Sequence, residues 1–196
     1  FSLSTRWNAF RHSSGEAMIE DIRRLGFDRV ELGYDLKAHL VPGVEDMVRS
    51  GGITVTSLHN FCPVPVGAPE GHPELWMLAS RYPGERKQAV RQTARTLEFA
   101  ARVGARVVVA HAGRVPMRYR TTALIAMFEN GKQYSSRYDK VKMRLLLQRE
   151  KKAPRYLDCL SMALDELMPV LEATGVRLAL ENLPTWETLP TEMEME

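Results

Sequence analysis

Hydrophobic and polar positions change periodicity along the chain in a way that predicts alternating strands and helices. Short apolar runs predict strands over residues 1–7, 29–32, 53–59, 106–111 and 176–184. Apolar residues at helical spacing predict helices after Ser14, around Val44, over residues 85–103 and from Pro154 to Gly175. Thr191 and Glu194 have the spacing of a capping box, so we expect another helix to begin there.

This alternation implies right-handed βαβ crossovers and a parallel sheet. The sequence contains neither Gly-x-Gly-x-x-Gly after the first strand nor a Walker loop, which disfavours a nucleotide-binding doubly wound sheet. A (β/α)8 barrel needs roughly 250 residues, and only five strands are predicted here. We therefore expect an α/β fold, a (β/α)8 TIM barrel cut short after strand five, as a single domain over residues 1–196.

Potential metal ligands follow or lie within four of the predicted strands. The run 176–184 is apolar enough to predict a strand buried on both faces, and it leads into Glu181. Glu31, His59 and His111 stand at similar points of the earlier strands. Because the carboxyl ends of parallel strands meet at one mouth of a barrel, the four side chains are expected to converge there. Imidazole and carboxylate groups suit Zn, Mn, Co or Fe(II), and carboxylate-rich sites suit Mg or Mn.

The composition is that of an ordinary soluble domain, with 44% hydrophobic and 26% charged residues among 196. Two cysteines do not make a disulfide framework, so a cytoplasmic location is expected. Cys62 lies close to His59 in sequence and could indicate a thiol nucleophile, although nothing else in the sequence supports such a pair. Apolar runs fall short of the roughly 20 residues of a membrane span, so no membrane partner is expected.

Residues 114–155 form a basic stretch that we interpret as a partly helical insertion. It holds twelve Lys or Arg residues against Glu129, Asp139 and Glu150. Such a stretch could bind a DNA backbone or a substrate phosphate. A solvated face or a subunit interface is the favoured interpretation. The Pro- and Gly-rich segment from 62 to 84 is long for a plain connection and predicts a lid or a pocket wall.

Three segments resemble the xylose isomerase-like TIM barrel superfamily: Leu-His-Asn-Phe (58–61), Val-Val-Ala-His-Ala-Gly (108–113) and Leu-Ala-Leu-Glu-Asn-Leu-Pro (178–184). That superfamily contains sugar-phosphate isomerases and epimerases and the endonuclease IV-like enzymes (AP endonuclease family 2). The resemblance implies that Glu181 is a metal ligand and, in the epimerase branch, also the proton-transfer base. His59 and His111 match positions that bind a second metal in the endonuclease branch and that more often line the sugar pocket in isomerases, and we expect both to be metal ligands here. It also implies a substrate pocket lined by Glu187, Glu31, Trp7 and Asn182. The family's further ligands, from strands six to eight, have no counterpart in this sequence.

The resemblance leads us to expect a sugar or sugar-phosphate isomerase or epimerase that depends on a divalent metal (Mn, Mg, Co or Zn) and acts through an enediolate. A zinc phosphodiesterase acting on abasic DNA is the alternative enzyme, and nucleic acid is then the partner. Endonuclease IV enzymes show His-Pro-Gly where this chain has His111-Ala112-Gly113, which favours the isomerase. A catalytically silent barrel that only binds a ligand is the third hypothesis, and association into a homo-oligomer is left open.

Overall fold

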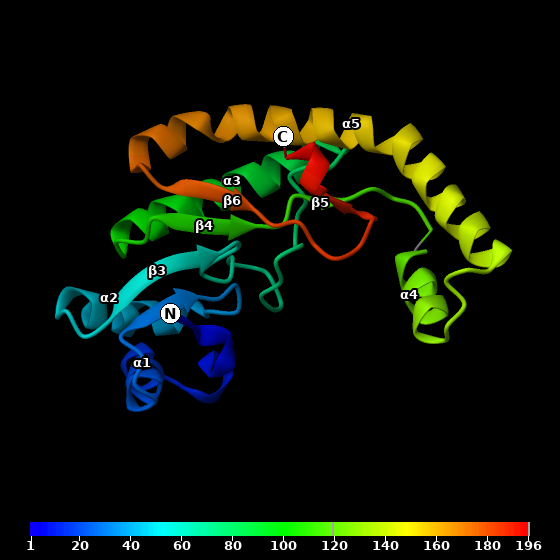
Figure 1. Cartoon of the computed structure of the whole chain (residues 1–196). Helices are drawn as coiled ribbons and strands as arrows, with labels where there is room; N and C mark the ends of the chain where they lie inside the picture. Colours follow the sequence, from blue (N-terminus) through cyan, green and yellow to red (C-terminus); the bar gives the residue numbers. More distant parts are fainter. Residues whose placement is uncertain (119, 196) are drawn as a thin grey trace.

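The computed structural model of the chain describes residues 1–118 and 120–195. Its main sheet has five strands: β1 (Leu3–Ser4), β2 (Arg29–Leu32), β3 (Thr54–His59), β4 (Val107–Ala110) and β6 (Arg177–Leu180). All neighbouring strands are parallel, and their order is β1-β2-β3-β4-β6, so they lie side by side in chain order (Figure 1). Successive βα units produce this order, which confirms the predicted parallel α/β sheet.

Helices form in the regions where apolar residues recur at helical spacing. The α-helices of the described residues are α1 (Gly15–Arg24), α2 (Val41–Arg49), α3 (Pro83–Arg102), α4 (Thr121–Glu129) and α5 (Ser136–Thr174). Short 3-10 helices are η1 (Thr5–Trp7), η2 (Ala9–Arg11), η3 (Ala38–Leu40) and η4 (Glu192–Glu194). The Ser14 hydroxyl caps α1 by accepting from the Ala17 amide, and η4 carries the capping box predicted for Thr191 and Glu194.

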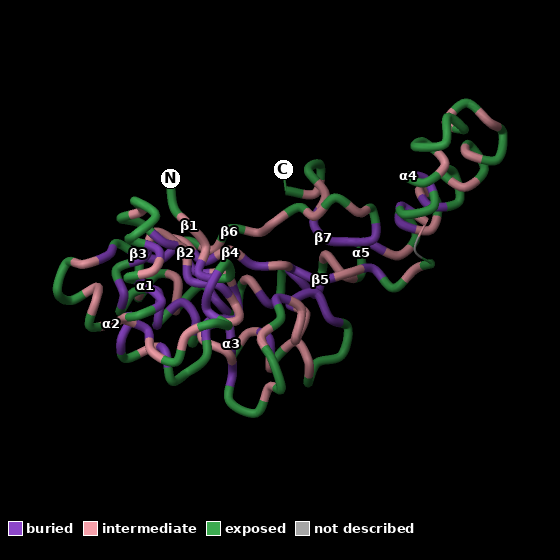
Figure 2. Tube along the Cα trace, turned by 90° about the horizontal axis from the view of Figure 1, so that it is seen from below, coloured by how far each residue is buried: buried purple, intermediate pink, exposed green. Residues whose placement is uncertain are grey.

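The two faces of the main sheet differ. Val30, Leu32, Leu58 and Val108 are fully buried and pack with apolar residues of the helices in one core. Residues on the opposite face, which we call the open face, are only partly buried, as at Val107. Buried residues concentrate in the sheet and the helices beside it, whereas α4 and the end of α5 next to it are largely exposed (Figure 2).

The prediction that the strand within 176–184 is buried on both faces was wrong. β6 forms the edge of the five-stranded sheet, with β4 as its neighbour. Leu178 and Leu180 pack against the core, but Arg177 and Ala179 are exposed. An apolar run predicts how well a strand can be buried, but not whether a second layer covers its other face. In the described part of the chain no such layer lies over β6.

Two further boundaries differ from the prediction. The first strand was expected over residues 1–7, but β1 stops at Ser4 and the chain turns into η1. A helix was expected to start at Pro154, but Pro154 lies inside the 39-residue helix α5. A proline removes one hydrogen bond from a helix, and packing of α5 on α3 and on the C-terminal segment offsets that loss. The basic stretch 114–155 therefore does not end at a helix boundary, because α5 continues past residue 155.

A second, two-stranded sheet was not predicted: β5 (Gly113–Arg114) pairs antiparallel with β7 (Thr188–Leu189). From there α4 and the first half of α5 extend away from the main sheet (Figure 1). No helix among the described residues is long and apolar enough to cross a membrane. The expected cytoplasmic location and homo-oligomer stay predictions.

Candidate metal-binding site

The carboxyl ends of three adjacent strands place three potential ligands on one face of the sheet. His59 is the last residue of β3, His111 follows β4, and Glu181 follows β6. In the strand ladder His59 pairs with Val109, and Val109 pairs with Ala179. Side chains alternate between the two faces along a strand, so residues two positions apart point to the same face. His111 and Glu181 each lie two positions beyond the residue that is in register with His59. All three side chains therefore point to the open face.

Three of the four side chains that were expected to converge meet, and Glu31 is not among them. Glu181 Oε2 lies 3.2 Å from His111 Nε2 and 3.5 Å from His59 Nε2. One ligand atom from each residue lies within 4.8 Å of the others. Two ligands with bonds of about 2.0–2.1 Å at a tetrahedral zinc are about 3.3 Å apart, so the Glu181–histidine distances already suit a shared ion. The site is half-open to solvent, because both histidine side chains are 13% exposed and Glu181 is 43% exposed.

The opposite nitrogen of each imidazole faces a hydrogen-bond acceptor. His59 Nδ1 lies 3.1 Å from the Asn60 carbonyl oxygen, and His111 Nδ1 lies 3.6 Å from a Glu74 carboxylate oxygen. An Nδ1–H aimed at an acceptor leaves the Nε2 lone pair free to bind a metal ion. Metal-binding histidines are usually oriented in this way by a carbonyl or a carboxylate. The residues therefore fit a divalent ion.

Glu74 is a part of the site that the sequence analysis missed. Its carboxylate accepts from Arg114 Nε at 2.9 and 3.1 Å and lies beside His111. The contact with His111 and the bonds from Arg114 outweigh burial and lower the pKa of Glu74 to about 2. Glu74 lies in the long segment that was predicted to form a pocket wall. Nothing local distinguished it from Glu70 or Glu85, because its partners are distant in sequence.

The other predicted pocket residues are not joined to the cluster by any hydrogen bond or ion pair among the described residues. Glu31 lies on the open face of β2 and accepts from the Ser57 hydroxyl at 3.0 Å. Trp7 is 41% exposed, with the Arg11 guanidinium 4.3 Å above its ring. Asn182 is exposed on the loop after β6. Their role in binding substrate stays a prediction.

Glu187 forms its hydrogen bonds outside the cluster of histidines and Glu181. Its side chain is 1% exposed, and its carboxylate accepts from the Arg120 amide at 2.6 Å, the Thr121 amide at 3.1 Å and the Thr121 hydroxyl at 2.6 Å. These groups form the start of α4, so Glu187 ties the loop after β6 to that helix. Burial by itself would raise the pKa of Glu187, but the three hydrogen bonds outweigh it and the pKa is lowered. Its predicted contact with substrate is not tested by this arrangement.

The structure does not support the Cys62 thiol as a nucleophile. Cys62 is 1% exposed, and burial raises the pKa of its thiol well above the ordinary value. A buried, protonated thiol is a poor nucleophile. His59 instead faces Glu181 and has the Tyr34 ring 5.1 Å away, in an edge-on contact.

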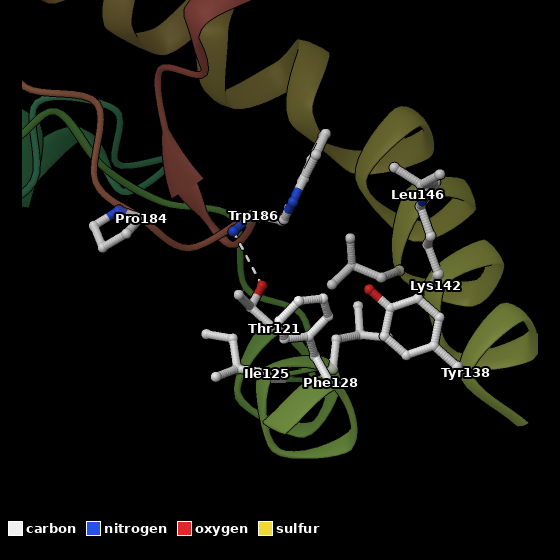
Figure 3. Close-up of a pocket in the computed structure, with 10 residues that line it drawn as sticks. Thr121, Ile125, Phe128, Tyr138, Lys142, Leu146, Pro184 and Trp186 are labelled. Carbon is white, nitrogen blue, oxygen red and sulfur yellow. Dashed lines mark hydrogen bonds between the residues drawn. The ribbon is translucent and has the colours of Figure 1, made fainter. Parts of the chain in front are cut away.

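An apolar pocket of about 430 Å³ lies between α4, the first half of α5 and the loop after β6. Ile125 and Phe128 come from α4, Tyr138 and Leu146 from α5, and Trp186 from the loop (Figure 3). The Trp186 amide donates to the Thr121 hydroxyl at 3.1 Å, drawn as a dashed line. No residue of the histidine cluster lines this pocket, so it is separate from the candidate metal site.

The sequence model of a family described as xylose isomerase-like TIM barrel matches residues 19–195. Among solved structures, 3-keto-D-glucoside 4-epimerase from E. coli has a TM-score of 0.62 at 18% identity, over 96% of this chain and 57% of that one. A D-tagatose 3-epimerase-like protein has a TM-score of 0.58 at 19% identity, over 94% and 53%. L-ribulose 3-epimerase has a TM-score of 0.57 at 16% identity, over 96% and 51%. The chain thus spans about half the length of these proteins, and no curated protein matches its sequence.

Proposed function

The chain belongs to the xylose isomerase-like TIM barrel family, and on that premise we propose that it acts in the divalent-metal-dependent isomerisation or epimerisation of a sugar or sugar phosphate. The observation that carries the proposal is the meeting of His59, His111 and Glu181 at the ends of three adjacent parallel strands. Similar structures named as a D-tagatose 3-epimerase-like protein, L-ribulose 3-epimerase and 3-keto-D-glucoside 4-epimerase support a sugar as the substrate class.

A divalent ion held by the three residues would act as a Lewis acid toward adjacent substrate oxygens. Glu181 presents Oε2 to both imidazoles, and no hydrogen bond to its Oε1 is found in the described part of the chain. Oε1 can therefore take the proton from the carbon next to the substrate carbonyl, which leaves an enediolate. Return of that proton from Glu181 to the neighbouring carbon, while a proton passes between the two substrate oxygens, would complete an isomerisation. An epimerisation would need a second acid that delivers a proton to the same carbon from the opposite face.

The chain's own side chains would also hold the substrate. Glu31 lies on the open face of the sheet, like the cluster, and its carboxylate can accept from sugar hydroxyls. We propose that Trp7 and Asn182, which are exposed, also contact the substrate. Glu187 would have to give up its three hydrogen bonds to α4 before it could contact a sugar.

The test has two stages, of which the first is metal binding. Elemental mass spectrometry on chain purified without chelator or nickel should find about one Mn, Co, Mg or Zn per chain. In the second stage the metal-loaded chain is incubated in deuterated water with D-tagatose, L-ribulose or D-allulose, and NMR follows exchange at the carbon next to the carbonyl. Exchange that disappears in Glu181→Gln supports the proposal. Saturable sugar binding without exchange would indicate a silent binding module instead.

A second candidate is a zinc phosphodiesterase acting on abasic DNA. Two imidazoles with one carboxylate are typical zinc ligands, and α5 carries exposed cations such as Arg137, Lys140 and Arg144 that could contact a DNA backbone. Two or three zinc ions per chain, and cleavage of a duplex with one abasic site that chelation abolishes, would favour this enzyme. If the duplex stays intact after incubation with the zinc-loaded chain, the phosphodiesterase function is excluded.

A further inference from the structure

A second pocket, of about 580 Å³, lies between the loop before α3, the segment after β5 and the middle of α5. We call it the cationic pocket, because Arg81, Arg114, Arg118 and Lys152 line it. These cations come from three parts of the chain, so only the fold brings them together. None of the candidate metal ligands lines this pocket.

One cation of the pocket, Arg114, is already paired with Glu74, whereas the other three cations form no ion pair with a carboxylate of the described residues. Among the described residues that line the pocket, Glu85 is the one carboxylate, and it is turned toward its own loop. Its Oε1 accepts from the Met77 amide at 3.2 Å, and its Oε2 accepts from the Ser80 hydroxyl at 2.6 Å. Within the described residues, no carboxylate forms an ion pair with Arg81, Arg118 or Lys152. An anion would therefore meet several cations at once.

One of the cations is held by a hydrogen bond, and a second lies near an aromatic ring. Lys152 Nζ donates to the Pro116 carbonyl at 2.7 Å, and the Arg81 guanidinium lies 6.0 Å from the centre of the Tyr156 ring. Side chains that are already positioned lose less conformational entropy when a ligand binds. Tyr82 and Tyr156 add aromatic surface, and methionine, valine and proline side chains add apolar surface. The pocket thus combines cations with surface for an uncharged organic group.

We propose that the cationic pocket binds a small organic phosphate monoester. A phosphate dianion matches several guanidinium and ammonium donors, which bind its oxygens by charge-assisted hydrogen bonds. The aromatic and apolar walls contact the organic part of the ester. The cations line a single concavity of small-molecule size, so they suit one phosphate group better than the evenly spaced phosphates of a duplex. This proposal goes beyond the proposed function, because the pocket contains none of the metal ligands, although Arg114 in its lining also holds Glu74 beside His111.

The test uses the full chain with EDTA present, so that phosphate cannot bind through a metal ion. Ribose 5-phosphate is titrated by calorimetry, with inorganic phosphate and ribose as separate probes. The variant Arg81→Gln/Arg118→Gln removes two pocket cations, neither of which forms an ion pair with Glu74 in the described part of the chain. The control Arg137→Gln/Arg144→Gln removes the same charge from exposed positions of α5 outside the pocket. Circular dichroism and thermal unfolding establish that both variants are folded.

We expect saturable binding of ribose 5-phosphate, weakened at least about tenfold in the pocket variant and less than about threefold in the control. Equal weakening in both variants would indicate a general charge effect and overturn the proposal. The same conclusion follows if the wild-type chain does not bind the ester. Inorganic phosphate binding as tightly as ribose 5-phosphate would also contradict it, because the walls would then contribute nothing.

Discussion

Glu181 and Glu187 follow the same strand, and both were predicted to serve one site, yet the fold places them in opposite environments. Glu181 is 43% exposed, and its Oε2 faces two imidazoles. Glu187 is 1% exposed, and three hydrogen-bond donors at the start of α4 occupy its carboxylate. One carboxylate is available to an ion or a substrate, and the other holds two segments together.

The role of a carboxylate at the end of a strand therefore depends on the groups that contact it, and not on its position in the sequence. The partners of Glu181 are imidazoles that can share it with a cation. The partners of Glu187 are two amides and a hydroxyl, which donate hydrogen bonds to its carboxylate oxygens. We therefore expect changes at Glu181 to affect ligand binding, and changes at Glu187 to affect stability.

The largest expected effect is that of Glu181→Gln on metal binding. Calorimetric titration with Zn²⁺ or Mn²⁺ should show affinity reduced by more than about 100-fold, since losing an outer partner alone costs about 10–100-fold. The thermal unfolding midpoint of the metal-free chain should change little. Glu172→Gln, at an exposed position of α5, is the matched control. Unchanged affinity in the Glu181 variant would remove this residue from the site.

A smaller loss of affinity is expected for Glu74→Gln, which keeps the shape of the side chain but removes the charge beside His111. Metal affinity should fall by about 10–100-fold, because the imidazole is then less firmly oriented. Glu70→Gln changes an exposed glutamate in the same loop and should leave the affinity unchanged. If both variants bind the ion like the wild-type chain, Glu74 has no orienting role.

Glu187→Gln should change stability and leave metal affinity as it is. The amide can accept fewer of the three hydrogen bonds, so urea unfolding should show a loss of about 1–3 kcal/mol in the free energy of unfolding. Glu192→Gln, an exposed glutamate on η4, is the control. A clear drop in metal affinity in the Glu187 variant would contradict the separation between the two glutamates.

The smallest effect concerns pH. The pKa of Glu187 in the folded chain is lowered from its ordinary value of 4.5. The ionised carboxylate therefore contributes stability that is fully present above pH 4.5 and is lost as the pH falls through the lowered pKa. The free energy of unfolding of the wild-type chain should fall below pH 4.5 more steeply than that of Glu187→Gln. Parallel pH profiles in urea titrations would contradict this assignment.

The sequence by itself determined the repeating elements and the candidate ligands. Strand and helix periodicities depend on neighbours within a few residues, so the bounds of β2 and the buried face of α1 were predictable. His59, His111 and Glu181 could be found because each ends an apolar run, and parallel strands bring such ends to one edge. The capping box at Thr191 is likewise a local signal.

Only the tertiary structure decided what lies between distant segments. The contact of Glu74 with His111, the hydrogen bonds from the start of α4 to Glu187, and the cationic pocket all join residues that are far apart in the chain. α5 continues through Pro154 because of packing that the sequence pattern does not reveal, and β6 is half exposed because the sheet ends there. Periodicity is a property of neighbouring residues, whereas the partners of a side chain depend on how the whole chain folds.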